Sequence, residues 1–277
     1  MDHFIFRQSA DLELLVCKPM EAQGFINAFT TRYGGVSPLP AAALNLGNYS
    51  QDDYANITEN RRRLKEALGL PDWPLLTLRQ IHSADLHSIF TIDGAAPFLD
   101  RNPPPGDAIV SCLTRVLLAI QTADCLPILI ADRRTGVTAA IHAGWRGTVA
   151  GIVTRTVGLM QQRLGVSPAD LIVAQGPAIG PCCFEVGPEV IARFRELHDQ
   201  VDCLLSGHQV DGRANLDLPL ANRLQFRQLG VDDSSIYDCN LCTVCQNDKF
   251  FSYRLEKGAE RPVGRLMGLI GRNQFDE

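Results

Sequence analysis

The stretch 119–147 constrains the fold of this chain more than any other part of the sequence. Two apolar segments in it, at 127–132 and 137–142, flank a short polar turn, which predicts two strands joined as a hairpin. Each segment lies beside a side chain that can bind a metal, Cys125 before the first and His142 at the end of the second. Because strands hold such donors rigidly, we expect a binding site at this end of the hairpin.

The residues after this hairpin predict a helix. From residue 148 apolar side chains recur at every third or fourth position until Gly165, which is the pattern of an amphipathic helix. The strand that ends at His142 therefore leads through a glycine-bounded turn into a helix N-terminus, where backbone N–H groups lack partners. Arg146 lies in that turn. We predict an anion-binding position beside His142.

A third candidate ligand lies upstream. The segment 73–82 is predicted to be a strand, in which Gln80 and His82 face the same side because strand side chains alternate. His82, Cys125 and His142 together form a three-ligand set that zinc accepts, with a fourth position left for water or substrate. No short ligand-pair motif supports this set, so its spacing alone does not decide the matter.

Two other interpretations use the same residues. In a metal-free Cys–His hydrolase, Cys125 would be the nucleophile and His142 the base. In a zinc-stabilised binding protein, a fourth protein ligand would take the position of the water. Bound zinc would occupy Cys125 as a ligand, so metal analysis separates the hydrolase from the zinc enzyme.

A rival metal site is the pair Cys242 and Cys245, to which Cys239 could be added. A lone C-x-x-C without a matching second pair is a weak sign of structural zinc. No neighbouring βαβ pattern supports a thioredoxin-like redox site either. We expect these cysteines to be buried or incidental.

The composition is that of an ordinary globular protein, with 45% hydrophobic and 21% charged residues among 277. No repeat or long linker divides it, so we expect one domain over 1–277. A net charge of −5 creates no global attraction to nucleic acid or to an anionic membrane. The N-terminus lacks the features of a secretory signal and no apolar run has the length of a membrane span, which predicts a cytoplasmic protein. Nine scattered cysteines fit reduced thiols better than a disulfide framework.

Eight short blocks follow one another along nearly the whole chain. They are TTRYGGVS at 30–37, LNL at 44–46, QIHS at 80–83, GDA at 106–108, TADCLP at 122–127, HAGWRG at 142–147, GPAIG at 176–180 and SYR at 252–254. In content and order they resemble the YfiH-like family, long labelled multicopper polyphenol oxidase or laccase-like. That family includes a bacterial peptidoglycan editing factor and the laccase domain-containing protein of animals. Cys242 also fits the family pattern, whereas Cys245 looks individual to this chain.

The resemblance implies a fold, a metal and an activity. The fold is a mixed α/β sandwich layered helix–sheet–sheet–helix, and the metal is one zinc ion on His82, Cys125 and His142. The activity is that of a purine nucleoside phosphorylase, which releases ribose 1-phosphate and the free base from adenosine, inosine and methylthioadenosine, with adenosine deaminase activity besides. The editing-factor branch implies an alternative, a zinc amidase that acts on UDP-muramyl peptidoglycan precursors. We expect a monomer or a weak homo-oligomer.

The laccase label can be tested against the residues. A multicopper oxidase needs about ten histidines, largely in His-x-His pairs, because copper geometry selects imidazole-rich sites. This chain has six histidines and no such pair; they stand at positions 3, 82, 87, 142, 198 and 208. A laccase of that design cannot be built from this sequence, and copper is not expected.

Phosphorolysis requires cationic and N–H donors that hold phosphate. Arg146, beside the helix N-terminus, is our first candidate, and Arg32 and Arg254 are further candidates. Asn45, in the loop after Arg32, and Gln80, beside His82, complete the predicted substrate-binding set.

Deamination requires a carboxylate that carries a proton, and Asp107 and Asp124 are the two available in the blocks above. The known zinc deaminase signature, His-x-Glu with Pro-Cys-x-x-Cys, is absent. Deamination by this chain would therefore be an independent chemical solution.

Overall fold

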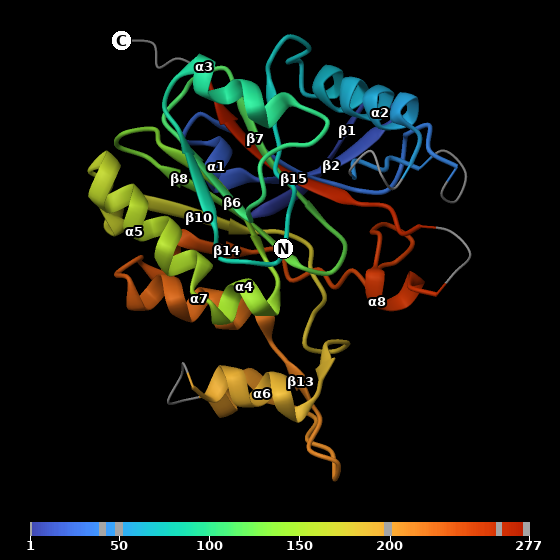
Figure 1. Cartoon of the computed structure of the whole chain (residues 1–277), viewed down its shortest axis with the longest axis vertical. Helices are drawn as coiled ribbons and strands as arrows, with labels where there is room; N and C mark the ends of the chain where they lie inside the picture. Colours follow the sequence, from blue (N-terminus) through green and yellow to red (C-terminus); the bar gives the residue numbers. More distant parts are fainter. Residues whose placement is uncertain (1, 39–42, 48–51, 197–200, 259–261, 274–277) are drawn as a thin grey trace.

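The protein is a sandwich of two six-stranded sheets with helices on the outer faces of both (Figure 1). The computed structural model describes residues 2–38, 43–47, 52–196, 201–258 and 262–273. This confirms the helix–sheet–sheet–helix layering that the family resemblance implies.

The first sheet is mostly antiparallel and combines the two ends of the chain. Its last strand, β15, lies between β3 and β7, and only the short β4 pairs in parallel, with β7. In spatial order its strands are β1 (Phe4–Ser9), β2 (Leu12–Cys17), β3 (Phe25–Thr30), β15 (Leu266–Arg272), β7 (Leu117–Thr122) and β4 (Leu75–Leu76).

The second sheet contains the hairpin that the sequence predicts. In spatial order its strands are β14 (Ile236–Asp238), β10 (Leu171–Gln175), β8 (Leu126–Asp132), β9 (Thr138–Ala143), β6 (Ala108–Ser111) and β5 (Leu86–Ile89). A small third sheet consists of β11 (Glu185–Val186), β13 (Ala214–Leu216) and β12 (Leu205–Ser206).

The helices are short apart from three that cover the sheets: α2 lies on the first sheet, and α5 and α7 lie on the second (Figure 1). Their bounds are α1 (Lys18–Glu21), α2 (Tyr54–Ala67), α3 (Ile92–Ala95), α4 (Trp145–Val149), α5 (Ile152–Leu164), α6 (Pro188–Arg195), α7 (Leu218–Gln228) and α8 (Tyr253–Glu256).

Side-chain alternation along the strands creates the layers. On β9, Ala140 packs into the core between the sheets, whereas Ile141 packs outward under α5. On β15, Ile270 enters the core between the sheets and Leu269 packs on the side of α2. His142 has the same parity as Ala140, so its side chain emerges at the end of β9 on the side that faces the other sheet.

The predicted hairpin is confirmed. Strands β8 and β9 pair antiparallel, and Pro127 stands opposite His142 in the register. Cys125 lies in the short connection where the chain passes from β7 in the first sheet to β8 in the second. The site is therefore built where the two sheets are joined covalently.

The helix predicted from residue 148 to Gly165 consists of two helices. The first, α4, begins at Trp145, and Gly151 interrupts it with a left-handed φ of 74° before α5 starts. Glycine adopts this conformation without the clash that a Cβ would cause. Gly165, also left-handed with φ 63°, ends α5 as the sequence predicts.

The strand predicted over 73–82 is wrong except for the two residues of β4. His82 lies in a bend with a left-handed φ of 60°. The carboxylate of Asp107 accepts hydrogen bonds from the backbone N–H groups of Ile81, His82 and Ser83, so these groups bind a side chain instead of a neighbouring strand.

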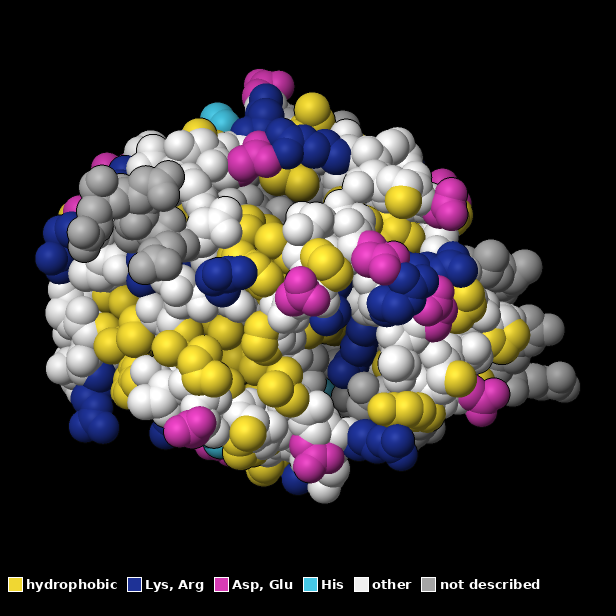
Figure 2. Space-filling model, turned by 90° about the horizontal axis from the view of Figure 1, so that it is seen from above, with side chains coloured by type: hydrophobic (Ala, Val, Ile, Leu, Met, Phe, Trp, Pro, Cys, Tyr) yellow, Lys and Arg dark blue, Asp and Glu magenta, His cyan; other side chains and the backbone are white. Residues whose placement is uncertain are grey.

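The face seen from above, over α2 and α3, mixes charges of both signs with hydrophobic side chains (Figure 2). On α2 the guanidinium of Arg62 pairs with Glu59 at 2.7 Å and also with Glu66. Such interspersed ion pairs leave no extended basic surface on this face. None of the described helices is long and apolar enough to cross a membrane.

Candidate active site

Three potential ligands that are far apart in the sequence meet at one end of the sandwich. The donor atoms of His82, Cys125 and His142 all lie within 4.8 Å of one another. His82 comes from the bend before β5, Cys125 from the connection between the sheets, and His142 from β9. The structure thus brings together the predicted metal set, although it reaches His82 through a bend and not through a strand.

Asp107 holds two of these ligands in place. Its Oδ1 accepts from Nδ1 of His142 at 2.8 Å and from the backbone N–H of His82 at 3.0 Å. Its Oδ2 accepts from both the N–H and the hydroxyl of Ser83, at 2.7 and 2.9 Å. Because a carboxylate only accepts, Nδ1 of His142 carries the proton and Nε2 is left to bind a metal.

The charges of this group are strongly coupled. Burial alone would raise the pKa of Cys125, but the nearby charge of His142 and hydrogen bonds from both imidazoles outweigh it and lower the pKa to about 6. Burial opposes protonation of His142, but the charge of Cys125 and the hydrogen bond to Asp107 raise its pKa to about 9. Burial also opposes ionisation of Asp107, yet hydrogen bonding to His142 keeps its pKa below the ordinary value. Both shifts favour the thiolate form of Cys125 and the protonated form of His142 when no metal is bound.

Gly144 and Gln80 constrain the backbone around the three ligands. A Cβ on Gly144 would lie 3.0 Å from Sγ of Cys125 and 3.4 Å from Cδ2 of His82, so only glycine fits between them without displacement. Gln80 accepts from the backbone N–H of Gln121 at 2.7 Å and donates to its carbonyl at 2.6 Å. This pair of hydrogen bonds fastens the His82 bend to β7.

The three ligands line a cavity of about 530 Å³. A cavity of this size accommodates a small-molecule ligand. Its described lining is Gln80, His82, Gln121, Thr122, Ala123, Asp124, Cys125, His142, Trp145, Arg146, Ile179, Phe184, Leu218, Tyr253, Arg254 and Arg265.

Three guanidinium groups face this cavity. Arg146 is exposed, stacks over its neighbour Trp145 at 4.2 Å, and has no ion-pair partner among the described residues. Arg254 donates to the backbone carbonyls of residues 183 and 185, at 3.3 and 3.0 Å, and Arg265 donates to the carbonyl of Val263 at 2.7 Å. Carbonyl partners orient a guanidinium without neutralising its charge.

Arg265 is a cavity residue that the sequence reasoning missed. Burial lowers its pKa below the ordinary value for arginine, and Cys125 and other nearby groups oppose that shift. The available signal was its position immediately before the final apolar strand, whose first residue, Leu266, pairs with Thr122 on β7. Tyr253 and Phe184 were also missed as lining residues.

Two predicted substrate-binding residues do not line the cavity. Arg32 is buried and donates to the carbonyl of Asn247 at 2.7 Å and to Glu256 at 3.2 Å, so it holds the segment around α8. Asn45 is fully buried, and Oδ1 of its side-chain amide accepts from the backbone N–H of Arg265 at 2.9 Å. Both residues therefore stabilise segments that line the cavity without lining it themselves.

The two predicted carboxylates differ in position. Asp107 has no exposed surface and lies behind the ligands. Asp124 lines the cavity, in a left-handed conformation with φ 87°. Its oxygens accept from the Thr243 hydroxyl at 2.6 Å and from the backbone N–H of Arg254, which ties the Cys125 connection to the C-terminal segment.

A larger cavity, of about 940 Å³, lies on the side of α7 and β14. It has an acidic lining that includes Asp217, Asp232, Asp233 and Asp238, and its arginine, Arg223, pairs with Asp233 at 2.8 Å. Such a lining repels anionic ligands. The smaller cavity, with three guanidiniums and the three metal-competent donors, is therefore the better candidate for catalysis.

Of the C-terminal cysteines, which the sequence predicts to be buried or incidental, Cys239 and Cys242 are buried and Cys245 is exposed. The structure brings Cys242 and Cys245 together with Cys182 and Cys183 as a second group of metal-competent side chains. The sequence reasoning missed this because the two cysteine pairs are far apart in the chain.

The site can be compared with those of known proteins. A family described as "Multi-copper polyphenol oxidoreductase laccase" matches residues 26–273. The chain belongs to this family. The family resemblance inferred from the sequence blocks is thereby confirmed.

Several members of this family carry names of nucleoside-processing enzymes. Purine nucleoside phosphorylase YlmD of Geobacillus stearothermophilus is 38% identical over 98% of both chains, and purine nucleoside phosphorylase YfiH of Escherichia coli is 34% identical over 93% of this chain and 98% of its own. A relative named as an adenosine deaminase, from an unknown prokaryotic organism, is 34% identical over 83% of this chain and 88% of its own.

Solved structures in the family have the same fold. The crystal structure of YlmD from Geobacillus stearothermophilus superposes with a TM-score of 0.89 at 37% identity, covering 98% of this chain and all of the other. The hypothetical protein YfiH of Bacillus licheniformis superposes with a TM-score of 0.88 at 30% identity, covering 97% and 99%.

The donor set that lines the cavity is compatible with a bound metal ion. Two imidazoles and one thiolate are ligands that zinc accepts in open sites. The described residues hold two groups of metal-competent side chains, the other being the four cysteines, and neither is the imidazole-rich assembly that a multicopper oxidase needs.

Proposed function

We propose that this protein is a zinc-dependent purine nucleoside phosphorylase that acts on adenosine, inosine and methylthioadenosine in the cytoplasm. One observation carries the proposal: an open three-ligand metal set lies in a cavity whose lining has three arginines and a single carboxylate. The names of the relatives in the family support the same substrate class.

The charge of the cavity favours phosphate. Arg146, Arg254 and Arg265 contribute three positive charges, against one from the Asp124 carboxylate and one from the Cys125 thiolate. Guanidinium groups bind phosphate oxygens through paired N–H donors. Arg146 also lies in the first turn of α4, where backbone N–H groups add to the positive potential. The cavity therefore offers phosphate both positive charge and hydrogen-bond donors.

Aromatic side chains provide a surface for the purine base. Trp145, Phe184 and Tyr253 line the same cavity, and Tyr253 is 53% exposed. Aromatic rings stack on purine bases and exclude water from the bond that breaks. In phosphorolysis a phosphate oxygen forms a bond to the anomeric carbon of the ribose as the bond to the base nitrogen breaks, and the base leaves with a proton.

His82, Cys125 and His142 would hold the zinc ion. When bound, zinc would supply Lewis acidity to a group in the cavity. Asp107 positions this set by fixing the tautomer of His142 and the bend that carries His82. We therefore assign Asp107 a positioning role and not the proton-transfer role considered from the sequence.

Adenosine deamination is the second activity that we propose for this cavity. It is supported by the relative named as an adenosine deaminase and by the carboxylate of Asp124 on the cavity wall. Asp124 is the carboxylate among the described lining residues that could exchange a proton with a purine.

The test is a comparison of substrate classes on one protein preparation. The metal-loaded protein is given adenosine, inosine, methylthioadenosine or a UDP-linked muramyl precursor, each with phosphate, and products are separated by chromatography. We expect free base from each nucleoside, with ribose 1-phosphate from adenosine and inosine and 5-methylthioribose 1-phosphate from methylthioadenosine, and no reaction of the precursor.

Two results would contradict the phosphorylase and favour the amidase or the metal-free hydrolase. Cleavage of the muramyl precursor without any nucleoside turnover would make the protein an amidase. Full nucleoside or ester cleavage by protein stripped of metal would indicate the Cys125–His142 hydrolase instead. A His142→Ala variant, whose zinc site lacks one ligand, should lose activity in every phosphorylase assay.

A further inference from the structure

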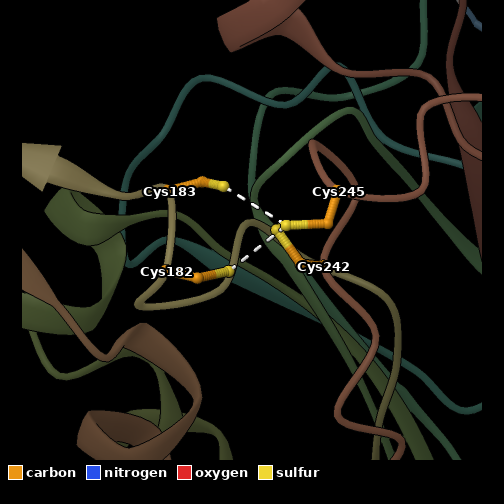
Figure 3. A group of neighbouring side chains, drawn as sticks. All are labelled: Cys182, Cys183, Cys242 and Cys245. Carbon is orange, nitrogen blue, oxygen red and sulfur yellow. Dashed lines mark hydrogen bonds between the residues drawn. The ribbon is translucent and has the colours of Figure 1, made fainter.

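Four cysteines from two distant segments converge on one point at the surface (Figure 3). Cys182 and Cys183 lie in the loop after β10, and Cys242 and Cys245 lie in the segment after β14. Strands β10 and β14 pair in parallel, so the segments that follow them leave the sheet at the same edge. The four Sγ atoms all lie within 4.8 Å of one another.

The sulfur distances match a metal site and not a disulfide. Sγ of Cys245 lies 3.5 Å from Sγ of Cys182 and 3.5 Å from Sγ of Cys183. A disulfide requires about 2.05 Å between the two sulfurs. Zinc–sulfur bonds of about 2.3 Å in a tetrahedron place the sulfurs about 3.8 Å apart. We propose that these four cysteines bind a second zinc ion in a closed structural site.

The exposure of the cluster argues against a packing role. Buried cysteines usually act as small hydrophobic residues. Cys182 and Cys245 are exposed and Cys183 is half-buried, so three of the four thiols do not fill the core. These three thiols could turn toward water, yet they lie beside one another and beside the buried Cys242, and a shared metal ion explains this arrangement.

The backbone around the cluster is shaped for sulfur ligands. The N–H of Gly180 donates to Sγ of Cys242 at 3.3 Å, which favours the thiolate form that metals bind. A Cβ on Gly180 would lie 3.3 Å from Sγ of Cys182 and 3.3 Å from Cβ of Cys242. Contacts this short leave little room for a larger residue, so glycine here admits both cysteine segments.

Backbone hydrogen bonds hold the two segments in register. The N–H of Ala178 donates to the carbonyl of Leu241 at 3.2 Å, and the N–H of Thr243 donates to the carbonyl of Ala178 at 3.0 Å. Within the first segment, the N–H of Cys183 donates to the carbonyl of Gly180 at 2.9 Å. The ligands are thus brought together by the fold, and the ion needs little further rearrangement.

The cluster is chemically distinct from the candidate active site. Four thiolates complete the coordination of zinc and leave no position for water, whereas the set at His142 has three ligands. Sulfur-only tetrahedral sites hold zinc or iron. We infer zinc, because sulfurs this close surround one ion and leave no space for a cluster of several irons.

The two segments that carry the cysteines also carry residues that line the cavity. The segment with Cys182 and Cys183 leads directly to Phe184, and the segment with Cys245 leads to Tyr253, and both aromatic residues line the cavity. An ion that joins the two segments closes a long loop and removes conformational freedom from both walls. Loss of the ion should therefore increase the mobility of both segments.

The test is the zinc content of purified, desalted protein, measured by mass spectrometry of the metal. We expect two zinc ions per chain in the parent protein, one in Cys245→Ser and one in His142→Ala. Cys203→Ser removes an exposed cysteine outside the cluster and should retain both ions. Hydrogen exchange should show faster exchange at 178–186 and 240–254 in Cys245→Ser but not in Cys203→Ser.

A measurement without any substitution covers the case in which Cys245→Ser fails to fold. In the parent protein loaded with cobalt, charge-transfer absorption from four thiolates should greatly exceed that expected from the single thiolate of Cys125. One zinc per chain in the parent, kept by Cys182→Ser and lost in His142→Ala, would overturn the proposal. So would iron in place of zinc, or a disulfide from Cys245 to Cys182 or Cys183 in peptides alkylated without reductant.

Discussion

Nδ1 of His142 lies 2.8 Å from Oδ1 of Asp107, and the same oxygen accepts the backbone N–H of His82 at 3.0 Å. One buried carboxylate oxygen thus fixes two of the three proposed zinc ligands. It orients the imidazole of His142 and the backbone of His82, which has a left-handed φ of 60°. The site therefore depends on a residue that does not line the cavity.

Replacing Asp107 with asparagine should weaken zinc binding by about 10- to 100-fold, as loss of the carboxylate that orients a histidine ligand does in other zinc proteins. Asparagine keeps the size of the side chain, but its NH2 group cannot accept the hydrogen bonds that the second carboxylate oxygen accepts. Competition with a coloured chelator measures the affinity, and Asp93→Asn on α3 is the matched control. Unchanged affinity in Asp107→Asn would show that the His142 and His82 geometry does not need the carboxylate.

Replacing Gly144 with alanine should also weaken zinc binding, but by a steric route. The backbone at Gly144 has φ −76°, which any residue adopts, so the effect comes from a Cβ 3.0 Å from Sγ of Cys125. Gly158→Ala, within α5 and with no atom within 4 Å of its Cβ, is the control. That control should raise the free energy of unfolding by about 0.5–1 kcal/mol, because alanine is the better helix residue. Equal zinc affinity in the two variants would contradict the close fit at Gly144.

Replacing Arg146 with alanine should raise KM for phosphate by about 10-fold or more, since a lost hydrogen bond to a charged group costs about 1.5–3 kcal/mol. Arg146 has no ion-pair partner within the described part of the chain, so the melting temperature should change little. Arg163→Ala on the exposed face of α5 is the control. An increase in KM for the nucleoside alone would move the phosphate position to Arg254 or Arg265.

The lowered pKa of Cys125, about 6, predicts how metal-free protein reacts with iodoacetamide. A thiol reacts as its thiolate, so the rate at Cys125 should rise as the pH passes through about 6 and level off near pH 7. The charge of His142 lowers this pKa, so the midpoint should move to higher pH in His142→Ala. Peptide mass spectrometry follows the modification, and added zinc should protect Cys125. A midpoint near 9 in the parent would contradict the lowered pKa of Cys125.

Local patterns were sufficient to predict the hairpin of β8 and β9 and the positions of Cys125 and His142 near its end. The bend at His82 was not predictable in this way, because it is imposed by Asp107, which lies 25 residues further along the chain. Alternation of apolar residues over 73–82 indicates a strand only when the backbone groups have a neighbouring strand to bind.

The same limit applies to the cysteine cluster and to Arg265. The C-x-x-C at Cys242 finds its matching pair through the parallel pairing of β10 with β14, which no local pattern specifies. Arg265 reaches the cavity because β15, at the end of the chain, is inserted beside β7. Long-range strand order decides both.

The phosphate dependence of adenosine cleavage tests the proposed phosphorylase activity directly. Metal-loaded protein is incubated with adenosine over a range of phosphate concentrations, and adenine, hypoxanthine and ribose 1-phosphate are quantified. We predict that ribose 1-phosphate equals the sum of adenine and of any hypoxanthine formed after deamination, that the rate saturates with phosphate, and that no base is released without phosphate or in His142→Ala. Adenine release that does not depend on phosphate, or no release at all from zinc-loaded protein, would contradict it.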